Sequence, residues 1–129
     1  MAEKIIDVMQ AICENPKGLH ELRNVGSEYY FRFKGHAMSL LHRTREMEGW
    51  GPYSLYIYPR FDGDLGALAR ELEHTSPDDA GITVAYFHSH DLEENPVFSK
   101  LYRILKQTYL KLDEIFDDIL GDNDPSNGA

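Results

Sequence analysis

The hydrophobic positions of this chain follow helical spacing at both ends and strand alternation between them. Apolar residues recur every three or four positions over residues 3–14, which predicts an N-terminal helix. Residues 28–34 alternate instead between an aromatic face and a mixed polar and aromatic face, which is typical of a half-buried strand. Similar patterns predict two more strands, over residues 37–45 and 53–60.

The second half of the chain begins with a short amphipathic helix. Its apolar stripe lies within residues 64–74, and Asp62 or Asp64 is the predicted N-cap. Residues 82–90, with the sequence ITVAYFHSH, are the most β-like run in the chain. Because this run is apolar on both faces, it predicts a strand at the centre of its sheet.

The last predicted element is a long helix. Asn95 is a good N-cap and Pro96 a good first helical residue, and the helix is expected to reach about Leu120, with Gly121 as its stop. At about 1.5 Å per residue it would be roughly 37 Å long. A domain of this size has a radius of gyration near ~14 Å. We therefore expect the far end to project beyond the domain.

The apolar residues of this helix form a heptad seam with one polar interruption. The seam consists of Phe98, Leu101, Leu105, Thr108, Leu112, Ile115 and Ile119. Such a seam can pack inside the chain's own core or across a homodimer. The pattern alone leaves both arrangements open, and we predict a homodimer.

The order α-β-β-β-α-β-α predicts a single α+β domain over residues 1–121. We expect a four-stranded antiparallel or mixed sheet, helices mainly on one face and a long C-terminal helix. Residues 122–129 are expected to be a disordered polar tail. No apolar run approaches the ~18 residues of a membrane span, so no membrane partner is expected. The single cysteine, Cys13, is expected to be buried, and its lack of a disulfide partner favours a cytoplasmic location.

Charge is unevenly distributed along the chain, which has a net charge of −9. Residues 17–60 carry seven Lys or Arg against four Asp or Glu, whereas residues 61–129 carry five against fifteen. This distribution disfavours non-specific nucleic-acid binding, because phosphates would be repelled on average. It favours a basic partner or self-association, unless the acidic residues serve only solubility.

One candidate contact surface is the outward face of the first three predicted strands. It carries Tyr30, Arg32, Lys34, Tyr56 and Tyr58. Aromatic rings interleaved with cations can stack nucleic-acid bases, and they are also enriched in protein interfaces. The third interpretation is a face covered by the protein's own segments.

Trp50 lies between two glycines in a predicted loop. It can be an exposed anchor for a partner or a plug in the core.

A second candidate surface is the acidic end of the last helix, with Asp113, Glu114, Asp117 and Asp118. These acids lie at the negative end of the helix dipole and form like-charge pairs four residues apart, so they repel one another locally. A basic partner surface would relieve the repulsion. The alternative is a solvated, fraying helix end.

A third candidate is the pair His88 and His90. Residues two apart in a strand point the same way, so both imidazoles could reach one cation. Zinc needs a third and usually a fourth ligand, for which Asp91 is the nearest candidate in sequence. The alternative is the end of an ordinary strand, with solvated or hydrogen-bonded histidines.

The stretch His-Ser-His followed by Ser99 resembles the zinc-site core of JAMM/MPN metalloproteases. The resemblance implies zinc binding by His88 and His90, with Ser99 beside the site and an upstream glutamate as the base. Glu21 or Glu28 could take that role. The sequence departs from the family pattern at Asp91, where the family has proline, and at Tyr102, where the family has its aspartate ligand.

These observations favour a small, acidic, non-enzymatic protein-binding module of the adaptor, inhibitor or immunity type, without a cofactor. The residues expected to contact the partner are Tyr30, Arg32, Trp50, Tyr56, Tyr58, Asp113, Glu114, Asp117 and Asp118. One alternative is a metal-dependent hydrolase centred on the histidine pair. Another is a single-stranded nucleic-acid binder that uses the tyrosine and arginine face.

Overall fold

The computed structural model describes residues 2–45, 49–93 and 95–121. The predicted tail over residues 122–129 therefore lies outside the described residues. The helical elements are α1 (Ala2–Glu14), the 3₁₀ turn η1 (Pro16–Gly18), α2 (Leu65–Leu72), the 3₁₀ turn η2 (Ser89–Leu92), α3 (Val97–Leu110) and α4 (Leu112–Gly121). The strands are β1 (Leu19–Val25), β2 (Glu28–Phe33), β3 (His36–His42), β4 (Tyr53–Tyr58) and β5 (Ala85–His88).

The five strands form one antiparallel sheet in the order β1-β2-β3-β4-β5. The predicted α+β class is thus confirmed, with five strands in place of four. The β2–β3 hairpin turns through Lys34 and Gly35, both with positive φ, and Phe33 pairs with His36. Two successive positive φ values suit the right-handed twist of the flanking strands.

Strand β1 has no counterpart in the sequence pattern. Its ladder with β2 is irregular between His20 and Arg23, and Glu21 adopts a left-handed backbone conformation with φ 53°. This irregularity breaks the alternation that would reveal a strand. The strand also lies at the sheet edge, where polar side chains are tolerated.

The prediction of a central strand over residues 82–90 was wrong. The strand covers only Ala85–His88 and lies at the opposite edge of the sheet, paired with β4 alone. The apolar character of the run has another origin. Ile82 and Val84 precede the strand and pack against the core cluster beneath α2, while Phe87 packs against the core on the other face.

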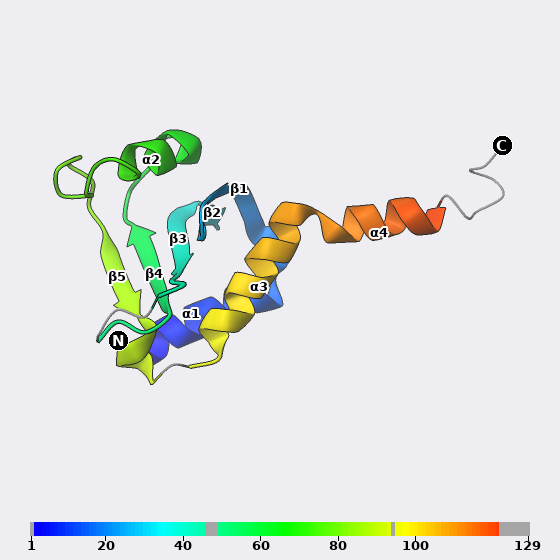
Figure 1. Cartoon of the computed structure of the whole chain (residues 1–129), viewed down its shortest axis with the longest axis horizontal. Coiled ribbons are helices and arrows are strands. Elements are labelled where there is room, and N and C mark those ends of the chain that lie inside the picture. Colours follow the sequence, from blue (N-terminus) through cyan, green and yellow to red (C-terminus); the bar gives the residue numbers. More distant parts are fainter. Residues whose placement is uncertain (1, 46–48, 94, 122–129) are drawn as a thin grey trace.

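Helices cover both faces of the sheet (Figure 1). Helices α1 and α3 pack together over one face, and their apolar residues meet the odd-numbered side chains of β2. This larger core contains Ile5, Met9, Ile12, Cys13, Tyr29, Phe31, Phe33, Met38, Leu40, Leu55, Leu92, Val97, Phe98, Leu101 and Leu105. Cys13 is buried as predicted, and burial raises the pKa of its thiol.

The opposite face is covered by α2 and the segment that follows it. Leu65, Leu68 and Ala69 of α2 pack against Tyr30 and Tyr58 of the sheet. Asp64 caps the helix, because its Oδ2 accepts a hydrogen bond from the Ala67 amide at 3.0 Å.

The single long helix expected at the C-terminal end is two helices. Asn95 caps α3 as predicted, with its Oδ1 accepting from the Val97 amide at 2.9 Å. The helix ends at Lys111, which has φ 55° and donates its amide to the Gln107 and Thr108 carbonyls. Helix α4 then runs away from the sheet (Figure 1). No helix in the described part of the chain has the length and apolarity needed to cross a membrane.

Candidate functional site

A cleft of about 610 Å³ opens on the α2 side of the sheet, at the edge formed by β4 and β5. Aromatic rings and carboxylates dominate its lining, which includes Trp50, Tyr56, Tyr86, His88, Asp78 and Asp91. Four of these residues were singled out from the sequence as parts of three separate candidate sites. The fold brings Trp50, Tyr56, His88 and Asp91 to one place.

The backbone around Trp50 is fixed by close approach to η2. Gly51 has φ 77°, and a Cβ at this position would lie 2.5 Å from Ser89 Oγ and 2.8 Å from the His90 nitrogen. Only glycine fits there. The His90 amide donates to the Trp50 carbonyl at 3.2 Å, and Ser89 Oγ accepts from the Tyr53 amide at 3.0 Å. These contacts with η2 fix the backbone at Trp50 and Gly51, and with it the position of the indole ring.

His88 forms the floor of the cleft. Its ring stacks on Trp50 with centroids 4.8 Å apart and an angle of 5° between the planes. Its Nδ1 lies 2.5 Å from Ser54 Oγ on β4. Burial and the Arg43 guanidinium lower the pKa of His88, while Asp91 partly offsets them, so the imidazole is neutral at pH 7.

The Ser54–His88 pair does not form an exposed catalytic dyad. Ser54 is fully buried and is not among the residues that line the cleft. A nucleophile needs access to its substrate as well as a base within hydrogen-bond reach. The hydrogen bond instead satisfies two buried polar groups and fixes the ring orientation of His88.

Arg43 lies beside Trp50. Its Cζ is 4.9 Å from the centroid of the indole ring, and its Nη1 donates to the Gly51 carbonyl at 3.2 Å. Its buried Nη2 has no hydrogen-bond partner among the residues that the structure describes. The chain thus already places one guanidinium against this aromatic group.

Tyr30 and Tyr58, predicted as partner-contacting residues, are buried beneath α2. Their rings stack with centroids 6.2 Å apart, and their hydroxyls join a network around Glu28. Tyr30 donates to Glu28 Oε1 at 3.2 Å, and Ser39 donates to Glu28 Oε2 at 2.6 Å. Ser39 Oγ also lies 2.8 Å from the Tyr58 hydroxyl. In this conformation the two tyrosines are covered by the protein's own segments.

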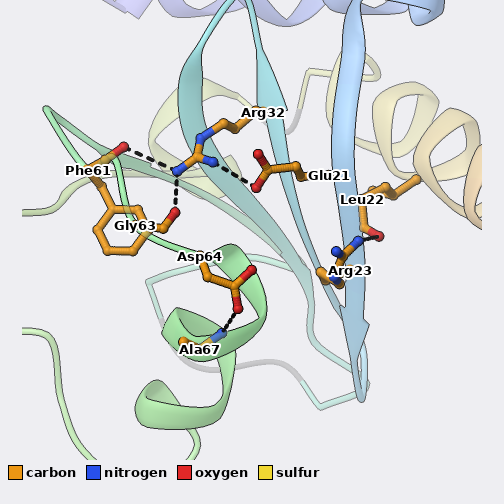
Figure 2. Close-up of polar contacts among 8 residues, drawn as sticks. All are labelled: Glu21, Leu22, Arg23, Arg32, Phe61, Gly63, Asp64 and Ala67. Carbon is orange, nitrogen blue, oxygen red and sulfur yellow. Dashed lines mark hydrogen bonds and ion pairs between the residues drawn. The ribbon is translucent and has the colours of Figure 1, made fainter.

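Arg32 is occupied in the same way (Figure 2). Its Nη1 contacts Glu21 Oε2 at 2.7 Å, and its Nη2 donates to the carbonyls of Gly63 at 2.6 Å and Phe61 at 3.4 Å. Its charged group therefore links β1 and β2 to the segment before α2. Three residues of the face proposed to stack and hold a nucleic acid, Tyr30, Tyr58 and Arg32, are therefore covered or engaged, whereas Tyr56 lines the cleft.

The two histidines of the metal hypothesis do not share a strand face. The strand ends at His88, and His90 lies exposed in the turn η2. No three His, Cys, Asp or Glu side chains within the described ranges are grouped as metal ligands would be. Glu21 pairs with Arg32, and Glu28 belongs to the buried network, so both proposed bases are engaged elsewhere.

Helix α4 carries the predicted acidic surface. Glu114, Asp117 and Asp118 are exposed, whereas the side chain of Asp113 lies outside the described residues. The same helix exposes large apolar residues, among them Phe116 at 53% and Leu120 at 68%. Phe116 also lines a groove of about 480 Å³ at the bend between α3 and α4.

Comparison with protein-family models, curated proteins and solved structures found no match to this chain. Functional assignment therefore depends on the two surfaces described above. Sequence reasoning missed Tyr86 and Asp78 as parts of the cleft, and it missed Arg43 as the cation that lies over Trp50. The exposed position of Tyr86 follows from the edge location of β5, which the apolar pattern did not indicate.

Proposed function

We propose that this protein is a small, non-enzymatic protein-binding module that docks through α4. Helix α4 lies away from the sheet (Figure 1). The observation that carries the proposal is its apolar stripe, in which Ile115, Phe116 and Leu120 are exposed. Amphipathic helices of this kind bind in apolar grooves of partner proteins. Contiguous exposed apolar residues rimmed by polar ones often mark such contacts.

The charges of α4 favour a groove bordered by lysine or arginine. Glu114, Asp117 and Asp118 lie on the same short helix as the apolar stripe. Basic residues around the groove would relieve the repulsion between these acids and would accelerate association. The net charge of −9 for the whole chain acts in the same direction.

A second copy of the chain is the competing occupant. The predicted homodimer can no longer use the whole heptad seam, because Phe98, Leu101 and Leu105 are buried in the chain's own core. Direct pairing of two α4 helices would bring like charges together. A dimer would avoid this by placing α4 against exposed cations of the other copy, such as Arg103 and Lys106 of α3.

The hydrolase and nucleic-acid alternatives receive less support. Within the described residues, no three His, Cys, Asp or Glu side chains are grouped as metal ligands would be, and Glu21 is paired with Arg32. Of the tyrosine and arginine face, Tyr30 and Tyr58 lie beneath α2 and Arg32 is engaged by the segment before it. A cytoplasmic location remains our expectation.

The decisive experiment compares the parent protein with Phe116→Ala and with the control Val8→Ala, which removes an exposed apolar side chain from α1. A protein captured by the parent is purified, and its affinity for the three chains is measured by calorimetry at two salt concentrations. We expect Phe116→Ala to weaken binding at least tenfold, as for a hot-spot residue, and Val8→Ala to have little effect. Weaker binding at higher salt would support the basic groove.

Two outcomes would contradict the proposal. One is equal affinity of the parent and Phe116→Ala for the purified partner. The other is a dimer, detected by light scattering of the parent alone, that dissociates in Phe116→Ala. That result would assign the stripe to a second copy.

A further inference from the structure

The geometry of the aromatic cleft points to a second binding site, and we propose that it takes the guanidinium group of an arginine side chain in a partner peptide. The rings of Tyr56, Tyr86 and Trp50 and the carboxylates of Asp78 and Asp91 line this cleft. The inference does not depend on the role of α4, which lies at the other end of the molecule (Figure 1).

The cleft offers aromatic surface that the protein does not use in its own core. Tyr86 on β5 is 60% exposed and Trp50 is 39% exposed. Tyr56 is directly opposite Tyr86 in the β4–β5 ladder, so the two residues are neighbours on one sheet face. Aromatic faces attract cations through the ring quadrupole, with tryptophan the strongest and tyrosine next.

The charges around the cleft favour a cation over an anion. Asp78 belongs to the segment between α2 and β5, Asp91 belongs to η2, and both side chains are exposed. Neutral His88 adds no positive charge to the floor at pH 7. Arg43 opposes a second cation, but its guanidinium lies over Trp50 and donates to Gly51, which leaves Tyr86 and Tyr56 unoccupied by it.

Arginine fits this combination better than lysine does. A guanidinium is planar, so it can stack on a tyrosine ring while its N–H groups donate to a carboxylate. The ammonium of lysine is a strongly hydrated point charge without a stacking face. The contact of Arg43 with Trp50 shows that a guanidinium is accommodated against the aromatic surface here. At about 610 Å³ the cleft also has room for the neighbouring peptide backbone.

The sole tryptophan of the chain reports directly on this site. Trp50 fluorescence is recorded while the full chain is titrated with a blocked pentapeptide, an arginine flanked by two glycines on each side. Matched peptides carry lysine or uncharged citrulline in place of arginine. We expect a saturable change with the arginine peptide, at least fivefold weaker binding of the lysine peptide and no saturation with citrulline.

Variants locate the site. Tyr86→Ala and Asp78→Asn should each weaken binding of the arginine peptide at least fivefold. Asp79→Asn is the matched control, because Asp79 is also exposed and adjacent in sequence but does not line the cleft. Phe116→Ala should bind the peptide as the parent does. Circular dichroism confirms folding, and Asp78→Asn carries the test if Tyr86→Ala fails to fold.

The proposal is overturned if arginine and citrulline peptides give the same titration. It is also overturned if Asp79→Asn loses as much affinity as Asp78→Asn, since that would show a general charge effect. A change in Trp50 fluorescence that persists in both cleft variants would place the peptide elsewhere. None of these results bears on α4, so the two proposals fail independently.

Discussion

Glu28 is a partly buried carboxyl group on the α2 side of the sheet, and it accepts hydrogen bonds from Ser39 and Tyr30. Burial raises its pKa, although the hydrogen bonds from Ser39 and Tyr30 and the charge of Arg43 oppose the effect. The two hydrogen bonds stabilise the ionised carboxylate, but they compensate only part of the free energy that burial costs it. Such a group makes the stability of the fold depend on pH.

We predict that Glu28→Gln stabilises the protein more at pH 7 than at pH 4. The folded-state pKa of Glu28 is higher than its ordinary value of 4.5. The carboxyl group therefore stabilises the fold fully below pH 4.5, and that contribution is lost as pH rises through the raised pKa. A neutral glutamine has no such loss. The difference in free energy of unfolding between variant and parent should increase with pH.

Urea unfolding at a series of pH values measures this difference. Glu71→Gln on the exposed surface of α2 is the control, and its profile should run parallel to that of the parent. A difference for Glu28→Gln that does not change with pH, or that increases toward acid, would show that the carboxyl group is not destabilised by burial.

Single residues also show where sequence reasoning stops. Alternation correctly placed Tyr30 and Arg32 on the face opposite Phe31. Tyr30 packs in the cluster beneath α2 and Phe31 in the other core, while Arg32 donates to the segment that leads into α2 (Figure 2). Alternation could not show that this face is covered, because the covering segments come from residues 61–84, remote in sequence. The same limit applies to the cleft. Trp50 and His88 were each noticed, but their stacking depends on the sheet register and on η2.

Helix α2 illustrates how local chemistry fixes an element boundary. The sequence left Asp62 and Asp64 as equal N-cap candidates, and the structure selects Asp64. We predict that Asp64→Ala lowers the free energy of unfolding by about 1 kcal/mol, because the amide of Ala67 loses its acceptor. Asp62→Ala should change it by less than about 0.5 kcal/mol. Thermal unfolding compares the two variants, and equal effects would rule out a specific capping role for Asp64.

At the scale of elements, local sequence signals predicted where an element begins better than they predicted its position in the sheet. The cap at Asn95 and the strand β2 follow from patterns that short-range physics enforces. The irregular strand β1 lacked such a pattern, and the edge position of β5 depends on which segment covers its face. The bend at Lys111 occurs where the helix leaves the core, since Leu105 is buried and Leu110 exposed.

The sheet lies between two unequal helical layers, α1 and α3 on one face and α2 on the other. The smaller layer, α2, has few apolar contacts of its own, so polar contacts that hold it to the sheet matter more. Helix α2 has only eight residues and one face to bury, whereas α1 and α3 also pack on each other. Arg32 supplies a polar connection between the sheet and the segment that leads into α2 (Figure 2). It does so with one charged group that reaches both Glu21 and the Gly63 carbonyl.

We therefore predict that Arg32→Lys destabilises the fold by about 1–2 kcal/mol although the charge is retained. A lysine ammonium cannot reproduce the planar fork that contacts Glu21 on one side and two carbonyls on the other. The control is Arg23→Lys, because Arg23 is exposed and its hydrogen bond among the described residues goes to the neighbouring Leu22 carbonyl, so it should tolerate the change within about 0.5 kcal/mol. Hydrogen exchange should show faster exchange of the α2 amides in Arg32→Lys, with those of α1 and α3 little affected. Equal exchange across all three helices would mean that Arg32 stabilises the domain as one unit, without a particular role in holding α2 to the sheet.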